Sequence, residues 1–289
     1  MIDLSQLSPM MQHYMETKKE YPDCVLFYRL GDFYEMFFDD ALTVSKELEI
    51  TLTGKDCGLS ERAPMCGVPF HALDSYLYRL VQKGYKVAIA EQMEDPRQAK
   101  GLVKREVIRV VTPGTITSSQ VLDETKNNYL MGIVYMDGIY GISTADISTG
   151  DFMVTEVDSD RELFDEINKF SPSEIICNNA FYMSGVDMDE LKNRYQVVIS
   201  ALDSRFFGEE SCRRILMEHF KVGALVGLGL EDYATGIIAA GAVMQYIYET
   251  QKSTLEHITT ITPYSTGQYM VIDTSTRRNL ELVETMREK

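Results

Sequence analysis

The sequence predicts an α/β protein with two domains, each of which mixes helices and strands. A chain of 289 residues is longer than one average domain and suits two. In its first 115 residues, runs with helical spacing alternate with short β-branched and aromatic runs. After residue 128, three strand-like runs follow one another before helices appear. The order of strand and helix signals after residue 128 differs from the order before residue 115, and this difference indicates a separate domain.

Polar stretches between these runs give the expected boundaries. Residues 116–128 are polar, with Ser118-Ser119-Gln120 and Asp123-Glu124-Thr125-Lys126, which is typical of a linker. We therefore expect a first domain over 1–115, a linker over 116–128, a second domain over 129–265 and a further segment over 266–289.

In the first domain, helix and strand signals are distinct. Ser8 followed by Pro9 marks a helix start, and the helix is expected to run to Lys19. A second amphipathic helix is expected from His71 to Lys83, ended by Gly84. The other expected elements are a strand Val25–Leu30 ending at Gly31, a helix Phe37–Leu48, strand and loop over Thr51–Pro69, and strands Val87–Ala90 and Val107–Val111.

The second domain opens with an expected strand meander. Tyr129–Met136 is followed by Asp137-Gly138, a strong hairpin signal. The remaining expected elements are strands Ile139–Ile147 and Asp151–Val157, helix Arg161–Phe170, strand Ile175–Ile176, helix Asp189–Tyr195, strand Val197–Ile199, and helices Ser211–Phe220 and Tyr233–Thr250. Three antiparallel strands followed by α/β alternation suggest a ribonuclease-H-like core.

The apolar run Tyr233–Tyr248 is the best membrane candidate in the chain. It is shorter than the roughly 18 residues that a span needs, and it contains two glycines and a glutamine. We therefore expect a buried core helix. No signal peptide opens the chain, so the five scattered cysteines are expected to be reduced thiols, in a cytoplasmic protein without a membrane partner.

The last residues predict an incomplete structure. Tyr269–Asp273 reads as a short strand, and a helix is expected from Thr274 with Leu280, Leu282 and Val283 on its apolar face. Nothing in the remaining sequence up to Lys289 would cover that face. We therefore interpret the chain as the front piece of a longer protein, ending in the first helix of a missing helical domain.

The formal charge of −16 argues against a general electrostatic hold on nucleic acid. The charge is uneven, because residues 1–120 carry −3 and residues 121–289 carry −13. Any DNA contact is therefore expected in the first part and must depend on local chemistry. The chain alone should bind DNA weakly.

A local motif supplies such chemistry at Phe33 and Glu35. It is Arg29-Leu30-Gly31-Asp32-Phe33-Tyr34-Glu35-Met36-Phe37-Phe38-Asp39-Asp40-Ala41. This run resembles the signature of the bacterial MutS family of DNA mismatch-repair proteins. Further runs are similar to that family in the same order: Ala63 to His71, Ala90-Glu91-Gln92 with Asp95-Pro96, and Arg109 to Thr115.

The resemblance covers the whole chain and implies a role for each part. The first domain would recognise mismatches, the ribonuclease-H-like second domain would be the connector, and the final segment would start the lever domain. It implies mismatched double-stranded DNA and a MutL-type protein as partners, and a full-length homodimer. This chain should be no enzyme and should need no cofactor: no G-x-x-x-x-G-K-[ST] occurs in it. The family's ATPase, with ATP and Mg, would lie beyond residue 289.

Residue spacing explains how Phe33 and Glu35 could act together. In an extended segment residues two apart share a face, so Tyr34 should turn into the domain, while Gly31 lets backbone approach closely. Stacking on a ring contributes about 1–3 kcal/mol per base, and opening a well-stacked step costs about as much. At a mismatch the opening costs less, so the Phe33 ring would wedge in there and kink the DNA.

Glu35 would be the polar partner of this wedge. Its repulsion by phosphates would penalise correctly paired DNA, and a protonated carboxyl could donate a hydrogen bond to a purine N7 or a thymine carbonyl. The resemblance places Lys55 at the DNA backbone and Met65, Gly67, Val68 and Pro69 in a loop near the groove. Arg62, Lys100, Lys104 and Arg105 are further candidates for phosphate contacts, but we expect solvated charges.

Three other interpretations compete with DNA recognition. Phe33 could instead belong to an apolar cluster with Phe27, Phe37 and Phe38. The second domain could be a nuclease, but Ile133-Val134-Tyr135 offers no acid at mid-strand, and Asp146 and Asp151 flank a turn; Asp187 is a third acid. A protein-interaction module suits that acidic domain better.

Overall fold

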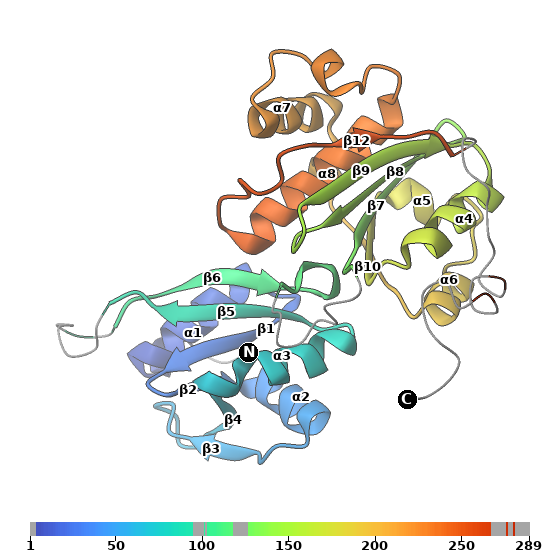
Figure 1. Cartoon of the computed structure of the whole chain (residues 1–289). Coiled ribbons are helices and arrows are strands. Elements are labelled where there is room, and N and C mark those ends of the chain that lie inside the picture. Colours follow the sequence, from blue (N-terminus) through green and yellow to red (C-terminus); the bar gives the residue numbers. More distant parts are fainter. Residues whose placement is uncertain are drawn as a thin grey trace. The chain divides into compact units, whose positions relative to one another are not determined.

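The computed structural model describes residues 4–94, 101, 103–117, 127–266, 276 and 280 (Figure 1). The chain divides into two compact units. The first holds the residues up to 126 together with 249–253, and the second holds 127–248 and the residues from 254 on. Most of the predicted linker and the predicted strand and helix after residue 266 lie outside the described residues, so the domain limits stay predictions.

The first unit is built on a six-stranded mixed sheet of order β3-β4-β2-β1-β5-β6. Strands β1 and β5 are parallel, and the other neighbours are antiparallel. Its elements are α1 (Pro9–Glu20), β1 (Cys24–Leu30), β2 (Phe33–Phe37), α2 (Phe38–Leu48), β3 (Thr53–Lys55), β4 (Ala63–Pro69), α3 (Leu73–Gln82), β5 (Lys86–Gln92) and β6 (Arg105–Val111). Short 3-10 turns span Leu4–Gln6, Phe70–Ala72 and Pro113–Thr115.

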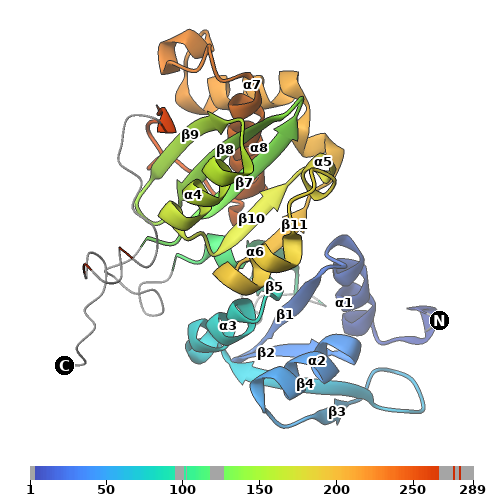
Figure 2. The same cartoon turned by 90° about the vertical axis from the view of Figure 1, so that its right-hand side faces the viewer.

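Helices cover both faces of this sheet, α1 on one and α2 with α3 on the other (Figure 2). Strand β1 therefore has no polar face: Leu26 and Tyr28 point to the α1 side, and Val25 and Phe27 point to the α2 side. A strand buried on both faces reads as a continuous apolar run, which is the pattern that predicted it.

The second unit has a six-stranded sheet of order β11-β10-β7-β8-β9-β12. Strands β7, β8 and β9 form the predicted antiparallel meander, and β10 and β11 are added parallel to β7. The ribonuclease-H-like arrangement is therefore present. Its elements are β7 (Leu130–Met136), β8 (Ile139–Asp146), β9 (Asp151–Val157), α4 (Asp160–Phe170), β10 (Glu174–Cys177), α5 (Asn179–Tyr182), α6 (Met188–Tyr195), β11 (Val198–Ala201), α7 (Glu209–Phe220), α8 (Ala234–Gln251) and β12 (Thr262–Pro263), with 3-10 turns at Ser204–Phe207 and Leu225–Leu228.

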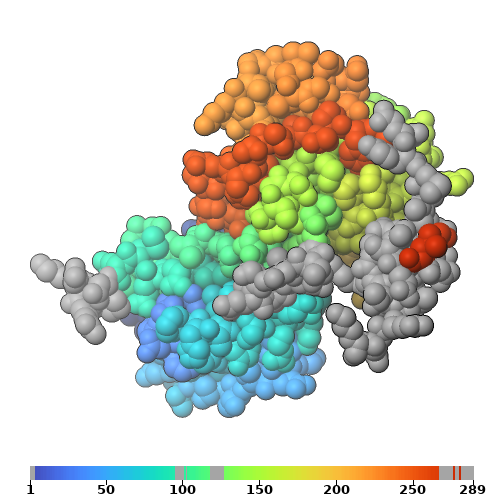
Figure 3. All heavy atoms as spheres, in the orientation of Figure 1, coloured from blue at the N-terminus to red at the C-terminus, as the bar shows by residue number. Residues whose placement is uncertain are grey.

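Helix α8 is the core helix that its apolar sequence predicts. It packs with α7 on one face of the second sheet, while α4, α5 and α6 cover the other face. Figure 3 shows the atoms around α7 closely packed on this unit. The first turn of α8 lies directly on β8, because a Cβ placed on Gly141 would be 2.4 Å from the carbonyl carbon of Thr235. Glu156 accepts hydrogen bonds from the free backbone N–H groups of Thr235 (2.6 Å) and Gly236 (2.8 Å). In the described part of the chain, no helix has the length and apolarity needed to cross a membrane.

All five cysteines are free and buried. Burial raises the pKa of Cys24 to about 11 and the pKa of Cys66, Cys177 and Cys212 to about 12. These thiols therefore stay protonated at neutral pH and act as small apolar side chains.

Candidate nucleic-acid interface

The β1–β2 turn places Phe33 at one end of the first sheet. Leu30 pairs with Phe33, so only Gly31 and Asp32 form the turn. Gly31 has φ +59°, and a positive φ at the first central position is what a two-residue hairpin turn of the II′ type requires. No atom lies within 4 Å of the position where its Cβ would be. No close approach within this chain requires the glycine, whereas the turn does.

Phe33 and Tyr34 face opposite ways, as the spacing predicts. The Phe33 side chain is 46% exposed, whereas Tyr34 is 3% exposed and its hydroxyl donates a hydrogen bond to Glu91. Burial, with the neighbouring Glu91 carboxylate, raises the pKa of Tyr34 well above its ordinary value. Phe27 is buried in the cluster on the α2 side and Phe37 in the cluster on the α1 side, and the exposed Phe33 belongs to neither, so the alternative that Phe33 joins them is wrong.

Glu35 shares the Phe33 side of β2 and is paired with Lys55. The Lys55 Nζ donates to the Glu35 Oε2 at 2.5 Å, and both side chains are partly exposed, 33% for Lys55 and 15% for Glu35. The ammonium also lies 5.6 Å from the centre of the Phe37 ring. Because Lys55 is on β3 and Glu35 on β2, the pair reaches across β4. The sequence indicated both residues but not their contact.

The segment Met65–Pro69 is a strand, not the expected loop. It forms most of β4, in which Gly67 pairs with Glu35 and Pro69 pairs with Phe33. A Cβ on Gly67 would lie 3.5 Å from the Glu35 Cγ and 3.9 Å from the Phe33 Cδ1, so this glycine lies beside both side chains.

Val68 faces the opposite side of β4 from Gly67 and Met65. Val68 is fully buried in the cluster under α2 and α3, so its side chain does not line this surface, and the expectation that it does is wrong. Met65 is partly buried against the cluster on the α1 side. Alternation along β4 explains the difference, since neighbouring residues face opposite sides of a sheet.

A second exposed aromatic, Phe70, lies next to this surface and was not among the predicted site residues. It is 43% exposed, and its N–H donates to the Asp32 carbonyl at 2.9 Å. The Arg29 guanidinium lies 4.2 Å from the centre of the Phe70 ring and 3.6 Å from the Glu91 carboxylate. Arg29 also donates from Nε to the Gly31 carbonyl at 2.5 Å. It therefore links the turn, the Phe70 ring and β5. The adjacency of Phe70 to Pro69 was the available signal.

The other basic candidates behave differently from one another. Arg105 is buried, and its Nε donates to the Arg29 carbonyl at 2.7 Å, so the expectation of a solvated charge is wrong there. Lys104 is exposed and pairs with Glu106 at 2.5 Å. Arg62 is exposed, and Lys100 lies outside the described residues.

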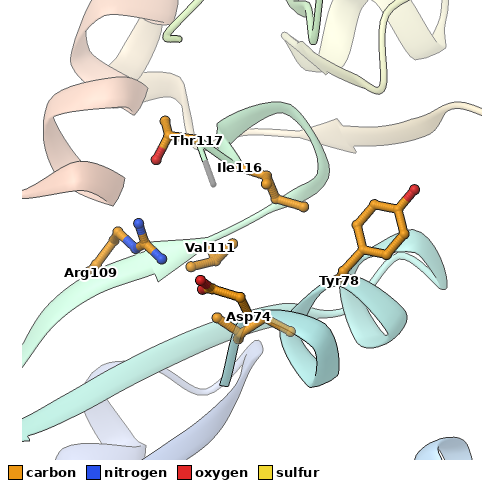
Figure 4. Close-up of a pocket in the computed structure, with 7 residues that line it drawn as sticks. Asp74, Tyr78, Arg109, Val111, Ile116 and Thr117 are labelled. Atoms are coloured by element: carbon orange, nitrogen blue, oxygen red, sulfur yellow. The ribbon is translucent and has the colours of Figure 1, made fainter. Parts of the chain in front are cut away.

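A small hollow lies at the opposite end of the same sheet from Phe33. Figure 4 shows the residues that line it. Asp74 on α3 and Arg109 on β6 line it, together with Leu77, Tyr78, Val111, Ile116 and Thr117. Burial lowers the pKa of Arg109, and the Asp74 carboxylate partly opposes that shift. The residues that were predicted to bind DNA do not line this hollow.

In the second unit the three aspartates considered for a nuclease have structural partners. Asp146 accepts from the Ser148 N–H at 2.8 Å, and Asp151 accepts from the Asn127 amide at 3.1 Å. Asp187 caps α6 by accepting from the N–H groups of Asp189 and Glu190. Strand β7 contains Ile133-Val134-Tyr135 and has no acidic residue.

Comparison with known proteins gives two matches in chain order. Residues 8–120 match the model of MutS domain I, and residues 128–259 match that of MutS domain II. The chain is 62% identical over 286 residues to the DNA mismatch repair protein MutS of Lachnoclostridium phytofermentans, covering 99% of this chain and 31% of that protein. It is 54% identical to the protein of the same name from Acetivibrio thermocellus (99% and 33%), and 48% identical to that from Clostridioides difficile (99% and 30%).

Both matched domains are MutS domains, and all three relatives are named DNA mismatch repair proteins, so the matches point to one class of protein. The chain belongs to the MutS family and contains the family's domains I and II. It spans about a third of the length of these curated relatives.

Proposed function

We propose that this chain recognises mispaired or unpaired bases in double-stranded DNA during mismatch repair, with Phe33 as the wedge. One observation carries the proposal. Phe33 is a 46% exposed aromatic residue beside a two-residue turn, on a strand whose next residue is anchored in the core. An apolar ring held outward on an anchored strand can enter a base stack without rearrangement of the domain around it.

The energetic balance favours damaged sites. Base stacking on an aromatic residue contributes about 1–3 kcal/mol, and opening an intact base step costs a similar amount. At a mispair the stack is already weakened, so the opening cost falls and the stacking gain remains. The wedge therefore selects sites by how easily they deform, which suits the recognition of many different mispairs.

In this proposal Glu35 supplies the hydrogen bond to the displaced base. It lies on the same side of β2 as Phe33, and Gly67 next to it has no side chain in the way. Paired DNA offers no displaced base to the carboxyl, so the negative charge of Glu35 adds nothing to the binding of paired DNA. Glu35→Gln supplies an amide N–H donor and removes the negative charge, so it should retain mismatch binding and bind paired DNA more tightly.

The remaining two thirds of the family's length would supply what this chain lacks. We infer an ATPase with ATP and Mg²⁺ beyond residue 289, a homodimer, and a connector domain that passes the signal to a MutL-type protein. The charge of −13 over residues 121–289 supports a protein partner for the connector, because phosphates would repel it.

The test compares wild type with Phe33→Ala. The chain is joined to the remaining two thirds of the L. phytofermentans MutS, and the dissociation constants for G·T-containing and fully paired duplexes are measured at one salt concentration. Losing about 1–3 kcal/mol of stacking should reduce mismatch preference roughly 5- to 150-fold.

Ile108→Ala is the matched control, since Ile108 is a 43% exposed apolar residue on β6 of the same unit. It should leave the preference unchanged. If Phe33→Ala weakens binding to both duplexes by the same factor, Phe33 has only a structural role and the proposal is wrong.

A further inference from the structure

We propose that Lys55 is a specificity-determining residue. It leaves Glu35 for a DNA phosphate only when a base at a mispair has formed a hydrogen bond with Glu35. The inference rests on the proposed function and deepens it. It starts from the ion pair between Lys55 Nζ and Glu35 Oε2, which lies beside Phe33. In the free protein this pair neutralises the carboxylate that would otherwise face the phosphates.

The two partners of the pair are held very differently. Glu35 is on β2, which is hydrogen-bonded to β1 on one side and to β4 on the other. Lys55 is the last residue of β3, a three-residue strand at the edge of the sheet. An ammonium on a four-carbon stem can change partner while its backbone stays in place. Lys55 is therefore the partner that moves.

Exposure makes such an exchange cheap. The Lys55 side chain is 33% exposed, so water already competes for the ammonium, whereas the Glu35 side chain is 15% exposed and largely covered. A phosphate at the same surface can replace the carboxylate as its partner. Lys55 therefore stays on Glu35 for as long as the carboxylate has no other partner, and it can change to a phosphate once the carboxylate has one.

The exchange has a different consequence on the two kinds of DNA. On paired DNA, a Lys55 that moved to a phosphate would leave the Glu35 carboxylate unneutralised beside the DNA phosphates. Their repulsion is unfavourable, so the Lys55–Glu35 pair should persist. At a mispair the base takes over Glu35, and Lys55 is then free to bind a phosphate. Lys55 thus forms its phosphate contact only when the base contact exists.

The dependence of affinity on salt concentration measures this contact directly. Log K falls as log salt concentration rises, and each phosphate contact makes this fall steeper by about 0.9; the slope is given below as this steepness. In the full-length chimera defined above, Lys55→Gln should lower the slope by about 0.9 on G·T DNA and leave it unchanged on paired DNA. In the Glu35→Gln background Lys55 is never neutralised, so Lys55→Gln should then lower the slope by about 0.9 on both duplexes.

Lys83→Gln provides the matched control. Lys83 pairs with Glu47 at 2.8 Å in the same unit, so the variant makes the same charge change away from the site and should alter neither slope. Equal loss of slope on both duplexes in the wild-type background would make Lys55 an ordinary phosphate contact and overturn the inference. No loss on either duplex would show a permanent pair and overturn it too. If the wild type itself shows no mismatch preference, the proposed function fails as well, which separates the two failures.

Discussion

Asp40→Ala is expected to destabilise the first unit by about 3–5 kcal/mol, the cost of breaking a buried charged network. Asp40 is 7% exposed and lies in the first turn of α2. Its carboxylate accepts hydrogen bonds from the Leu26 N–H (2.9 Å), the Tyr14 hydroxyl (3.1 Å) and the Lys18 ammonium (2.9 Å). One side chain thus joins α1, β1 and α2, and its removal leaves three donors without this partner.

The measurement should report on each unit separately. The chain has no tryptophan, so hydrogen exchange of backbone amides in urea is more informative than fluorescence. Residues 24–48 should lose protection at lower urea concentration, while residues 130–157 should be unaffected. Asp39→Ala is the control, because Asp39 is exposed in the same helical turn. Its effect should stay below about 1 kcal/mol, the scale of a helix-dipole contact. Equal effects of the two substitutions would show that the network does not stabilise the unit.

Gly141→Val is expected to destabilise the second unit by about 3 kcal/mol, the upper end of the range for overpacking. A Cβ at this position would lie 2.4 Å from both the carbonyl carbon and the oxygen of Thr235, and 2.7 Å from the Gly236 nitrogen. These are backbone atoms in the first turn of α8, so no rotamer change can relieve the clash. The helix itself must move away from β8.

Amide exchange in α8 and β8 is the appropriate measurement for this variant. Both elements should lose protection together, since the Glu156 cap would also be pulled from the helix start. Gly223→Ala serves as the comparison, because no atom lies within 4 Å of the Cβ position there. Should Gly141→Val be as stable as Gly223→Ala, the close approach of helix and strand would be wrong.

The sequence predicted the features of the site that depend on neighbours along the chain. Strand alternation separated the exposed Phe33 from the buried Tyr34, and the first strand was predicted to end at Gly31, where the structure has a turn. The order of strand and helix signals in residues 129–250 was enough to predict the ribonuclease-H-like core. Each of these signals involves residues a few positions apart.

Features that depend on strand pairing could not be predicted in this way. The Lys55–Glu35 pair exists because β4 lies between β2 and β3 in one register, and single-sequence patterns do not specify register. The burial of Arg105 and of Val68 depends on the same pairing. The sequence also did not show which acid at the end of the motif is buried. Asp39 is exposed, whereas Asp40, one residue later, is buried and accepts the three hydrogen bonds described above.

The position of β2 inside its sheet has a mechanical consequence. Strands β1 and β4 hold it from both sides, so a force applied to the Phe33 ring is spread over several backbone hydrogen bonds. In the proposed function, Phe33 on β2 would then yield less than the DNA double helix, so most of the bending would occur in the DNA. A substitution that softened β2 without touching Phe33 would therefore blur the difference between sound and damaged duplexes, even though every contacting side chain remained in place.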